Sequence, residues 1–311
     1  MKIVRAEHLG MCFGVRQAID LAEKQAQMAP LTILGELAHN ETVLSRLRAQ
    51  GIGIADHLDA VRTRSLMVTA HGASERAMGQ ARARGFQVLE ATCPLVTLVH
   101  RSVWDLIRQG YHPVIIGRRE HVEVRGLTGD LGEHDVILQE SDLAGLVSRP
   151  RFGVVAQTTQ PIDHVRFMVS RLRQRFPESE VRFIDTVCQP TKQRQAAAVE
   201  LAQQCDVVVV IGGQQSNNTR ELVATCQHYC PRVHQVQSAD DLRPDWFTGA
   251  DRIGITAGTS TPDASIDAVA QWLEQKFQSE NASKSSPIGQ SITSSSTEPL
   301  LTSQVKGQVG C

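Results

Sequence analysis

The sequence lacks several features that would assign it to a common class of protein. It has no apolar run long enough to cross a membrane, and its first residues lack the apolar core and small-residue cleavage site of a signal peptide. Lys and Arg number 32 against 33 Asp and Glu, without a basic stripe or a long run of one sign. We therefore expect a cytoplasmic protein that binds neither membranes nor nucleic acid.

Two nucleotide-binding motifs are also missing. The sequence contains no phosphate loop of the nucleoside triphosphatase type, and no GxGxxG motif leads from a strand into a helix. The pair Gly51 and Gly53 precedes no such helix. A redox reaction in this protein would therefore draw its electrons from a separate protein and not from a bound nicotinamide.

Seven cysteines are present, and their odd number does not indicate a disulfide framework. Cys12, Cys93 and Cys188 share one context, because each follows a strand-like run by a few residues and begins a helical pattern. Backbone N–H groups and the helix dipole at such a position favour the thiolate, which is the form that binds metals. The cysteines without this context are Cys205, Cys226, Cys230 and Cys311.

The repeated context favours metal binding, although a single buried cysteine is more often a small core residue. Three thiolates suit an iron–sulfur cluster with an open coordination position better than structural zinc, which normally has four protein ligands. Cys226 and Cys230 are spaced to share a helix face, but no second pair at ligand spacing accompanies them. We expect these two to pack in the core.

The chain is predicted to form three similar α/β lobes. Short β-branched runs alternate with helical patterns, as in parallel sheets with helical crossovers. The third unit is one strand short, and the amino-terminal run KIVRA, which precedes Cys12, is the candidate to complete it. Residues 279–311 are rich in Ser, Thr, Gln and Gly, and we expect them to form a disordered tail. The predicted divisions are 1–12 for the completing strand, 13–92, 93–187 and 188–278 for the lobes, and 279–311 for the tail.

A second signal is a set of six strand ends that are followed by histidine or small polar residues opening a helix. Helix amino termini offer free N–H donors and a favourable dipole to phosphate. Any one of these segments is by itself most simply an ordinary helix cap, but six in three matched units indicate an anion site. The segments are marked by His39, His71, His121, Thr158, Ser216 and Ser260.

From Met1 to about Lys276 the sequence resembles the 4-hydroxy-3-methylbut-2-enyl diphosphate reductase family. The stretches that carry the resemblance are GMCFGV, LAHN, TAHG, ATCPLVT, HVEV, QTT, SNN and AGTSTPD. It implies a pseudo-threefold α/β fold around one 4Fe-4S cluster with three cysteine ligands. The implied reaction removes an allylic hydroxyl reductively, giving isopentenyl and dimethylallyl diphosphates in the last step of the methylerythritol phosphate pathway. A one-electron donor protein such as ferredoxin or flavodoxin would supply the electrons.

The resemblance also implies a role for individual residues. Glu123 would be the acid of a proton relay, and Thr158 would lie beside the substrate hydroxyl. The cluster ligands would be Cys12, Cys93 and Cys188. The remaining substrate-binding residues, which would hold the diphosphate, would be His39, His71, His121, Ser216, Asn217, Asn218 and Ser260.

Three positions depart from the family pattern. Val122 stands where proline is common, Asn217 where serine is frequent, and Gln189-Pro190 where Tyr-Ala is usual. These departures leave the charged and ligating positions intact and affect the shape of the pocket more than the reaction. From the residues alone two other classes stay open, which are a non-redox dehydratase that uses an open iron as a Lewis acid and a phosphate-binding module with structural zinc.

Overall fold

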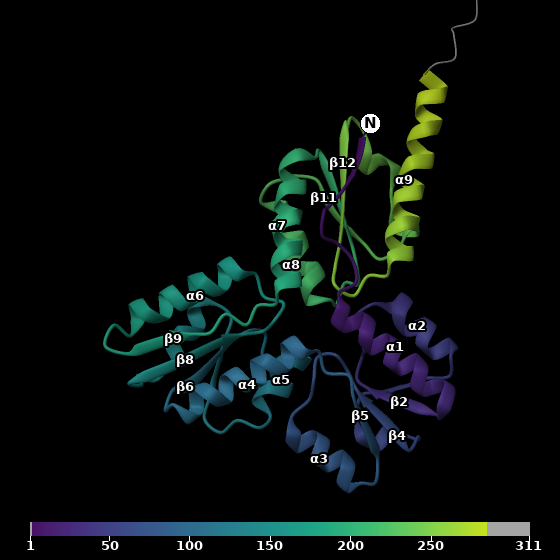
Figure 1. Cartoon of the computed structure of the whole chain (residues 1–311). Helices are drawn as coiled ribbons and strands as arrows, with labels where there is room; N and C mark the ends of the chain where they lie inside the picture. The colour runs from purple at the N-terminus through teal and green to yellow at the C-terminus, as the bar shows by residue number, and fades with distance from the viewer. Residues whose placement is uncertain (1, 285–311) are drawn as a thin grey trace, which may run out of the picture.

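A computed structural model of the chain describes residues 2–284, and it consists of three α/β lobes around a common centre (Figure 1). Each lobe contains one four-stranded sheet, and every strand pair within the sheets is parallel. The predicted three-lobed α/β architecture is confirmed. No helix within residues 2–284 is long and apolar enough to span a membrane.

The first lobe contains the sheet with strand order β3-β2-β4-β5. Its strands are β2 (Leu31–Leu34), β3 (Gly53–Ala55), β4 (Ser65–Val68) and β5 (Gln87–Glu90). Its helices are α1 (Phe13–Met28), α2 (Glu41–Ala49), α3 (Glu75–Ala83) and the 3-10 turn η1 (Leu58–Ala60). The sequence patterns did not predict β3, because three residues that include a glycine carry almost no periodic signal.

The second lobe repeats this order as β7-β6-β8-β9. Its strands are β6 (His112–Ile116), β7 (Asp135–Ile137), β8 (Arg151–Ala156) and β9 (Glu180–Phe183). Its helices are α4 (Pro94–Arg108), α5 (Val122–Thr128), α6 (Ile162–Arg175) and the 3-10 turn η2 (Glu140–Gly145). The central strands β6 and β8 are buried almost throughout, as expected for parallel strands that are covered on both faces.

The third lobe takes its fourth strand from the amino terminus. Its order is β11-β10-β12-β1, and β1 (Lys2–Arg5) pairs with β12 in parallel. The other strands are β10 (Val207–Ile211), β11 (Val233–Val236) and β12 (Arg252–Ala257). The helices are α7 (Gln189–Gln204), α8 (Asn217–Gln227), α9 (Asp263–Lys284) and the 3-10 turns η3 (Ala239–Asp241) and η4 (Pro244–Phe247). The strand that opens the chain thus closes the ring of lobes.

Helix α9 extends past the predicted end of the third lobe. It runs to Lys284, so residues 279–284 are helical and were wrongly assigned to a disordered tail. The physical reason is that Glu280, Ala282 and Lys284 are good helix formers and that no proline follows until Pro287. The rest of that predicted tail, 285–311, lies outside the described residues. The lobe boundaries after residues 12, 92 and 187 remain a prediction.

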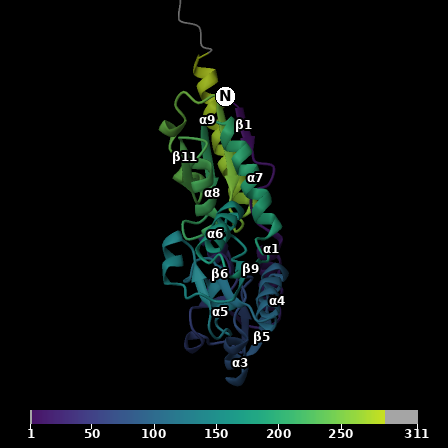
Figure 2. The same cartoon turned by 90° about the vertical axis from the view of Figure 1, so that its left-hand side faces the viewer.

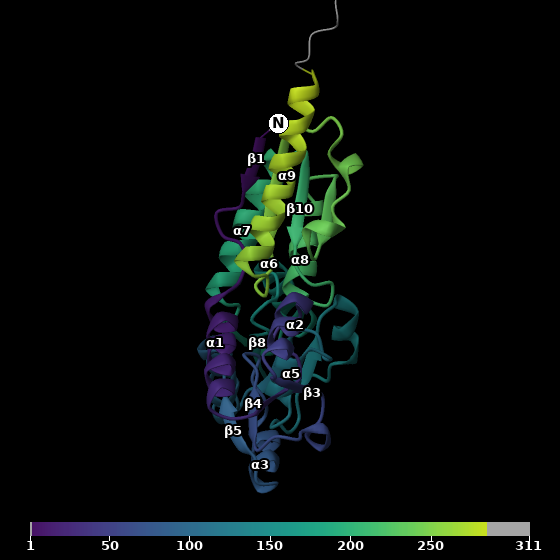
Figure 3. The same ribbon diagram turned by 90° about the vertical axis from the view of Figure 1, so that its right-hand side faces the viewer.

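The three cysteine-led helices lie on one side of the flattened molecule. Figure 2 shows α1, α4 and α7 together at one edge of the view, and Figure 3 shows α1 and α7 at the opposite edge after the reverse turn. Each of these helices is preceded by an edge strand of a sheet, which is β1, β5 or β9. The same connection therefore occurs once in every lobe and directs three helix starts towards the centre.

Close backbone contacts hold the lobes against one another. A Cβ atom at Gly213, in the third lobe, would lie 2.0 Å from the carbonyl oxygen of His39 in the first. A Cβ atom at Gly126, in α5, would lie 3.3 Å from the carbonyl oxygen of Gly72. Glycine is therefore required at Gly213, where any side chain would force the first and third lobes apart.

Candidate active site

Three cysteine thiols line one cavity at the centre of the molecule. Cys12, Cys93 and Cys188 are the N-cap residues of α1, α4 and α7, and all three line this cavity. The lobe symmetry thus brings together cysteines that are far apart in the sequence. A Cβ atom at Gly14 would lie 2.7 Å from the Cys93 sulfur, so glycine there gives this sulfur its room.

The helix starts and the burial of the thiols act in opposite directions on their ionisation. Burial raises the pKa values of Cys93 and Cys188. Hydrogen bonds from the Leu95 and Val96 backbone to Cys93, and from Thr191 to Cys188, lower these pKa values in part. A bound cation would stabilise the thiolates that burial alone disfavours.

The spacing of the thiols fits a cluster better than a single ion. Among residues 2–284, only the histidine group described below has three metal-binding atoms that all lie within 4.8 Å of one another. The three cysteine sulfurs therefore do not converge on one point. Ligands of an iron–sulfur cluster bind different irons, so the chemistry and the separation of these donors fit such a group.

The other four cysteines play no part in this cavity. Cys205, Cys226 and Cys230 are buried in the apolar core of the third lobe, and Cys311 lies outside the described residues. Burial raises the pKa of Cys226 to about 12, which keeps its thiol protonated. The predicted packing role of Cys226 and Cys230 is confirmed.

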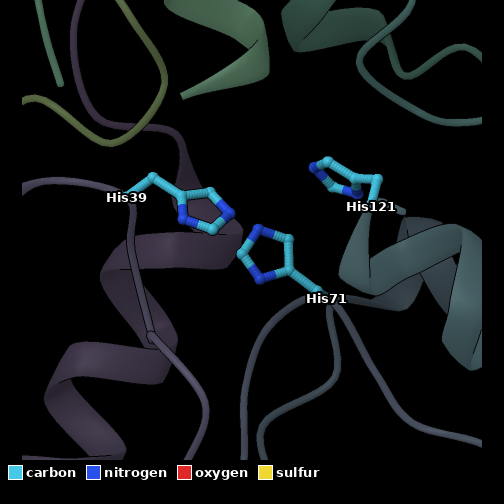
Figure 4. Close-up of side chains that lie close together, drawn as sticks. All are labelled: His39, His71 and His121. Atoms are coloured by element: carbon cyan, nitrogen blue, oxygen red, sulfur yellow. The ribbon is translucent and has the colours of Figure 1, made fainter. Parts of the chain in front are cut away.

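Three histidines from two lobes gather in an adjoining pocket (Figure 4). His39 follows β2, His71 follows β4, and His121 is the N-cap residue of α5. Their ring centroids lie 5.5 Å apart for His39 and His71, 5.6 Å for His71 and His121, and 6.1 Å for His39 and His121. All three follow central strands, where the strand order of a parallel sheet reverses and ligands commonly bind.

His71 and His121, which are half-buried, are neutral in the free pocket. Burial and the neighbouring His121 and His39 lower the pKa of His71 to about 3. Burial, His39 and nearby arginines lower that of His121 to about 4. The Nδ1 atom of His121 accepts a hydrogen bond from the Glu123 N–H at 3.2 Å, so Nε2 carries the proton. The Nδ1 atom of His39 lies 2.8 Å from the Glu36 carboxylate.

The third lobe completes this pocket with polar side chains. Ser216, the N-cap residue of α8, lines it together with Asn217, Asn218 and Ser260, and all four are buried. The Oδ1 atom of Asn218 accepts a hydrogen bond from the Thr259 N–H at 3.0 Å. Its Nδ2 atom and the Ser260 hydroxyl have no hydrogen-bond partner among the described residues. Because buried donors are normally paired, these two indicate an acceptor-rich ligand.

Glu123 and Thr158 form a hydrogen-bonded pair in the wall of the thiol cavity. Glu123 is 3 % exposed, and its carboxylate accepts bonds from the Thr158 N–H at 2.7 Å and from the Thr158 hydroxyl at 2.8 Å. Burial raises the pKa of Glu123 to about 7, against the opposing effect of these two bonds. The carboxyl group is therefore able to hold and release a proton near neutral pH.

The structure brings together all twelve residues predicted from the sequence. The thiol cavity also contains His71, Glu123 and Thr158, while the histidine pocket contains the remaining predicted residues. The two cavities share Val15, His71, Thr159 and Thr259 in their walls, so they lie next to one another.

Three contributors were not predicted individually. Thr159 and Thr259 lie inside the QTT and AGTSTPD segments, where the threonine next to an assigned residue was the available signal. Glu36 contacts His39 across one turn of chain, and Asn217 Nδ2 reaches Thr159 at 3.4 Å. These contacts depend on loop conformations for which the residue pattern contains no signal.

The three departures from the family pattern lie at helix starts. Val122 is the first residue of α5, next to the N-cap, and Gln189 and Pro190 open α7 directly after Cys188. Proline is favoured in the first turn of a helix, so Pro190 suits its position. Asn217 keeps its amide in the pocket wall, as a serine there would keep its hydroxyl.

The histidine group admits two kinds of ligand on distance alone. Its ring nitrogens lie within 4.8 Å of one another, which is close enough to hold one divalent cation. The charges of Arg118, Arg220 and Arg125 act on His121, and they oppose a second cation nearby. The surrounding donors and arginines therefore favour an anion.

Three lobes with parallel sheets that meet at a thiol cavity and a histidine pocket define a pseudo-threefold α/β protein with three cysteines at its centre. The profile of the LytB protein family matches residues 3–274. The chain belongs to this family, whose members are iron–sulfur enzymes.

Curated relatives bear the name 4-hydroxy-3-methylbut-2-enyl diphosphate reductase. The protein of Methylibium petroleiphilum is 39% identical over 277 residues, covering 87% of this chain and 84% of the relative. Those of Geobacter metallireducens and Aquifex aeolicus are 34% and 35% identical, covering 88% of this chain and 98% and 96% of the relatives.

Solved structures agree in fold. The E-1-hydroxy-2-methyl-but-2-enyl-4-diphosphate reductase from Plasmodium falciparum is 26% identical and superposes with a TM-score of 0.82, covering 87% of both chains. A second structure, of (E)-4-hydroxy-3-methyl-but-2-enyl diphosphate reductase, the terminal enzyme of the non-mevalonate pathway, is 33% identical with a TM-score of 0.65. It covers 88% of this chain and 100% of that one.

Proposed function

We propose that this chain is a 4-hydroxy-3-methylbut-2-enyl diphosphate reductase, which converts its substrate to isopentenyl diphosphate and dimethylallyl diphosphate. The reaction breaks the allylic carbon–oxygen bond, consumes two electrons and two protons, and releases the hydroxyl oxygen as water. The adjacent thiol cavity and histidine pocket support this proposal, since the substrate has a reducible end and an anionic end.

The thiols of Cys12, Cys93 and Cys188 would hold one 4Fe-4S cluster, one from each lobe. When bound, the cluster supplies an open iron as a Lewis acid and passes single electrons. No nicotinamide motif occurs in the sequence, so a one-electron donor protein such as ferredoxin or flavodoxin would reduce it. The six described cysteines are all free, which agrees with the reducing cytoplasm as the compartment.

Glu123 would provide the proton that leaves with the hydroxyl oxygen. With its pKa near 7, a substantial fraction of this carboxyl group is protonated at neutral pH. The Thr158 hydroxyl, 2.8 Å from the carboxylate, is placed to pass the proton on or to bind the substrate hydroxyl. The hydrogen bonds from Thr158 hold the carboxyl group in one orientation and so lower the cost of aligning it.

The histidine pocket would hold the diphosphate. The Nε2–H of His121, the amide of Asn218 and the hydroxyl of Ser260 are donors of the kind that phosphate oxygens accept. The amino termini of α5 and α8 add their dipoles. Binding energy at this end fixes the carbon chain against the thiol cavity. Contacts far from the reacting bond would therefore help to orient that bond.

The observation that carries the proposal is the buried Glu123–Thr158 pair in the wall of the thiol cavity. Anaerobic purification followed by a visible spectrum, iron and sulfide analysis, and turnover with an artificial one-electron reductant tests it. We expect a coloured protein that turns over only when reductant is present. Turnover without reductant would instead indicate a dehydratase, and a colourless protein loaded with zinc would contradict the cluster.

A further inference from the structure

One arginine is buried among the segments that carry the cysteines. Arg194 lies in α7, after Cys188, and only 8 % of it is exposed. Its Nε and Nη2 atoms donate to the carbonyl oxygen of Gly10 at 3.0 Å and 2.8 Å, and its Nη1 atom donates to that of Pro190 at 2.9 Å. The guanidinium group therefore joins a carbonyl group just before Cys12 to one just after Cys188.

These bonds connect two segments that begin different helices. The Gly10 segment leaves β1 of the third lobe and continues into α1 of the first. The N–H of Cys12 donates to the Thr259 carbonyl oxygen at 3.0 Å, which fixes the segment to the third lobe from another side. The side chain of Arg194 adds a tie to α7, which Cys188 begins. The rigid, planar guanidinium group thus helps to fix the positions of two thiols relative to one another.

Arg194 carries a buried positive charge without a carboxylate partner. The ion pairs within 4.0 Å among residues 2–284 do not include it, and its acceptors there are the two carbonyl oxygens. Burial lowers the pKa of Arg194, while the charges of Cys12 and Cys188 raise it. The guanidinium group is therefore within electrostatic reach of both thiols. Because a buried charge without an opposite charge is costly, the two thiolates are its natural partners.

The three lobes differ at this position in a way that the fold does not require. In α1 the residue at the same distance after the cysteine is Ala18, and in α4 it is Val99. Each of these side chains is 1 % exposed. An apolar side chain therefore packs at this place in two lobes, whereas Arg194 occupies it in the third. The helix does not need a cation there, so the charge serves the site.

The helix starts around the thiol cavity lack competing acids. Helices α1, α4 and α7 have no acidic residue in the first turn, although α2, α3, α5, α6 and α9 each have one. Acidic side chains normally stabilise a helix amino terminus. Their absence leaves the three dipoles and Arg194 to act on negative charge at the cysteines. Among the residues that line the cavity, Glu123 alone carries a carboxyl group.

We propose that Arg194 is a positioning residue and the counter-charge of the three-cysteine centre, where it favours the uptake of an electron from the donor protein. This inference rests on the cluster proposed above. Three thiolate ligands contribute negative charge, and each electron that the centre accepts adds to it. A fixed cation nearby stabilises the reduced form more than the oxidised form and so raises the reduction potential. The bonds to Gly10 and Pro190 hold the cation in place without neutralising it.

Potentiometric titration of the cluster-loaded protein, followed by its visible spectrum, tests the counter-charge. We expect Arg194→Gln to lower the equilibrium constant for one-electron reduction by about tenfold, a fall of about 59 mV, because a buried positive charge is lost. Arg194→Lys keeps the charge and should stay within about threefold of the parent protein. The potential is measured on loaded molecules only, so a lower yield of folded protein does not change it.

Iron release to a chelator tests the positioning role. Release should be about tenfold faster in both Arg194→Gln and Arg194→Lys, since neither side chain reproduces the planar fork that bonds to Gly10 and Pro190. The potential should therefore follow the charge at this position, whereas iron release should follow the geometry of the donors.

Arg16→Gln is the matched control. Arg16 lies in the first turns of α1, shortly after Cys12, and its exposed side chain pairs with Asp263 at 3.2 Å. The substitution changes the net charge of the protein by the same amount as Arg194→Gln. Solvent and salt screen an exposed, paired charge, so the potential and the rate of iron release should stay within about twofold of the parent protein.

The outcomes separate this inference from the proposed function. If the parent protein holds its cluster and Arg194→Gln has the same potential, Arg194 is not the counter-charge and the cluster stands. If Arg194→Lys shifts the potential as far as Arg194→Gln, the positive charge is not the cause. Unchanged iron release in both variants would overturn the positioning role. If the parent protein holds no cluster, the inference and the proposed function are both overturned.

Discussion

The thiol cavity and the histidine pocket are built on the same three lobes but use their symmetry in opposite ways. In the thiol cavity each lobe contributes the same residue at the same place, a cysteine that is the N-cap of the helix following an edge strand. In the pocket the equivalent strand ends carry histidine in the first lobe, histidine and threonine in the second, and serine in the third.

The difference reflects the chemistry of what each region would bind. Three irons of a cluster present equivalent coordination positions, so three equivalent thiols suit them. The proposed allylic diphosphate substrate has a hydroxyl group at one end and a charged diphosphate at the other. Identical side chains from the three lobes would therefore not suit both ends. Symmetry is kept where the ligand is symmetric and lost where it is not.

The largest effect is expected from substituting one of the three cysteines of the thiol cavity. Cys93→Ser should remove the cluster and all activity, because a serine oxygen replaces a thiolate that binds iron. Cys230→Ser is the matched control, since this buried thiol lies in the core of the third lobe and donates to the Asp206 and Arg232 carbonyl oxygens, which a hydroxyl can also reach. Iron analysis and turnover of both variants measure the difference. Full iron and activity in Cys93→Ser would refute the ligand assignment.

A substitution at Glu123 should reduce turnover without loss of iron. Glu123→Gln keeps the size and hydrogen bonding of the side chain but removes the proton, so turnover should fall by about two orders of magnitude or more. Iron content and diphosphate affinity should stay as in the parent protein. A rate within a fewfold of the parent would mean that the proton comes from His121, from Thr158 or through water.

The same substitution should alter the pH dependence of stability. The pKa of Glu123 is about 7 in the folded protein against 4.5 for a glutamate in the unfolded chain, so the folded state binds more protons between these values. Stability of the parent protein should therefore fall relative to Glu123→Gln as pH rises from 4.5 to 7, by about 2 kcal/mol. Anaerobic urea unfolding at pH 5 and pH 8 measures this difference. Parallel curves for the two proteins would mean that Glu123 is not buried as described.

A smaller effect is expected from the third-lobe donors. Ser260→Ala removes a buried hydroxyl that has no hydrogen-bond partner among the described residues, and it should weaken diphosphate binding by about tenfold. Ser45→Ala, on the exposed face of α2, removes a hydroxyl bonded to Glu41 and should have no effect on binding. Equal affinities of the two variants would exclude Ser260 from the pocket.

The smallest effect is expected outside both regions. Residues 285–311 contain few large apolar side chains, so a chain ending at Lys284 should keep its activity and melt within about 2 °C of the full chain. Thermal melting of the two cluster-loaded proteins measures this. A larger drop would show that these residues contribute to the stability of the body.

Much of the architecture was predictable from local patterns. The three cysteine contexts are a strong signal because the same order of strand, cysteine and helix recurs three times. The buried run Val207–Ile211 is a strong strand signal because a parallel strand covered on both faces needs an unbroken apolar stretch. Strand β3 was missed because its three residues gain their pairing from β2 and not from their own preference. The end of α9 was misplaced because composition alone does not mark where a helix of good formers ends.

The sequence by itself determined which residues carry chemistry, since a thiol at a helix start or a histidine after a strand has its properties wherever the chain folds. Only the tertiary structure decided how these residues meet and what their environment does to them. The pKa of Glu123 near 7 comes from its burial in the cavity wall, and the cavity itself brings together Cys12, Cys93 and Cys188 from far apart in the sequence. Such properties depend on distance and desolvation, which become defined only when the lobes close around the centre.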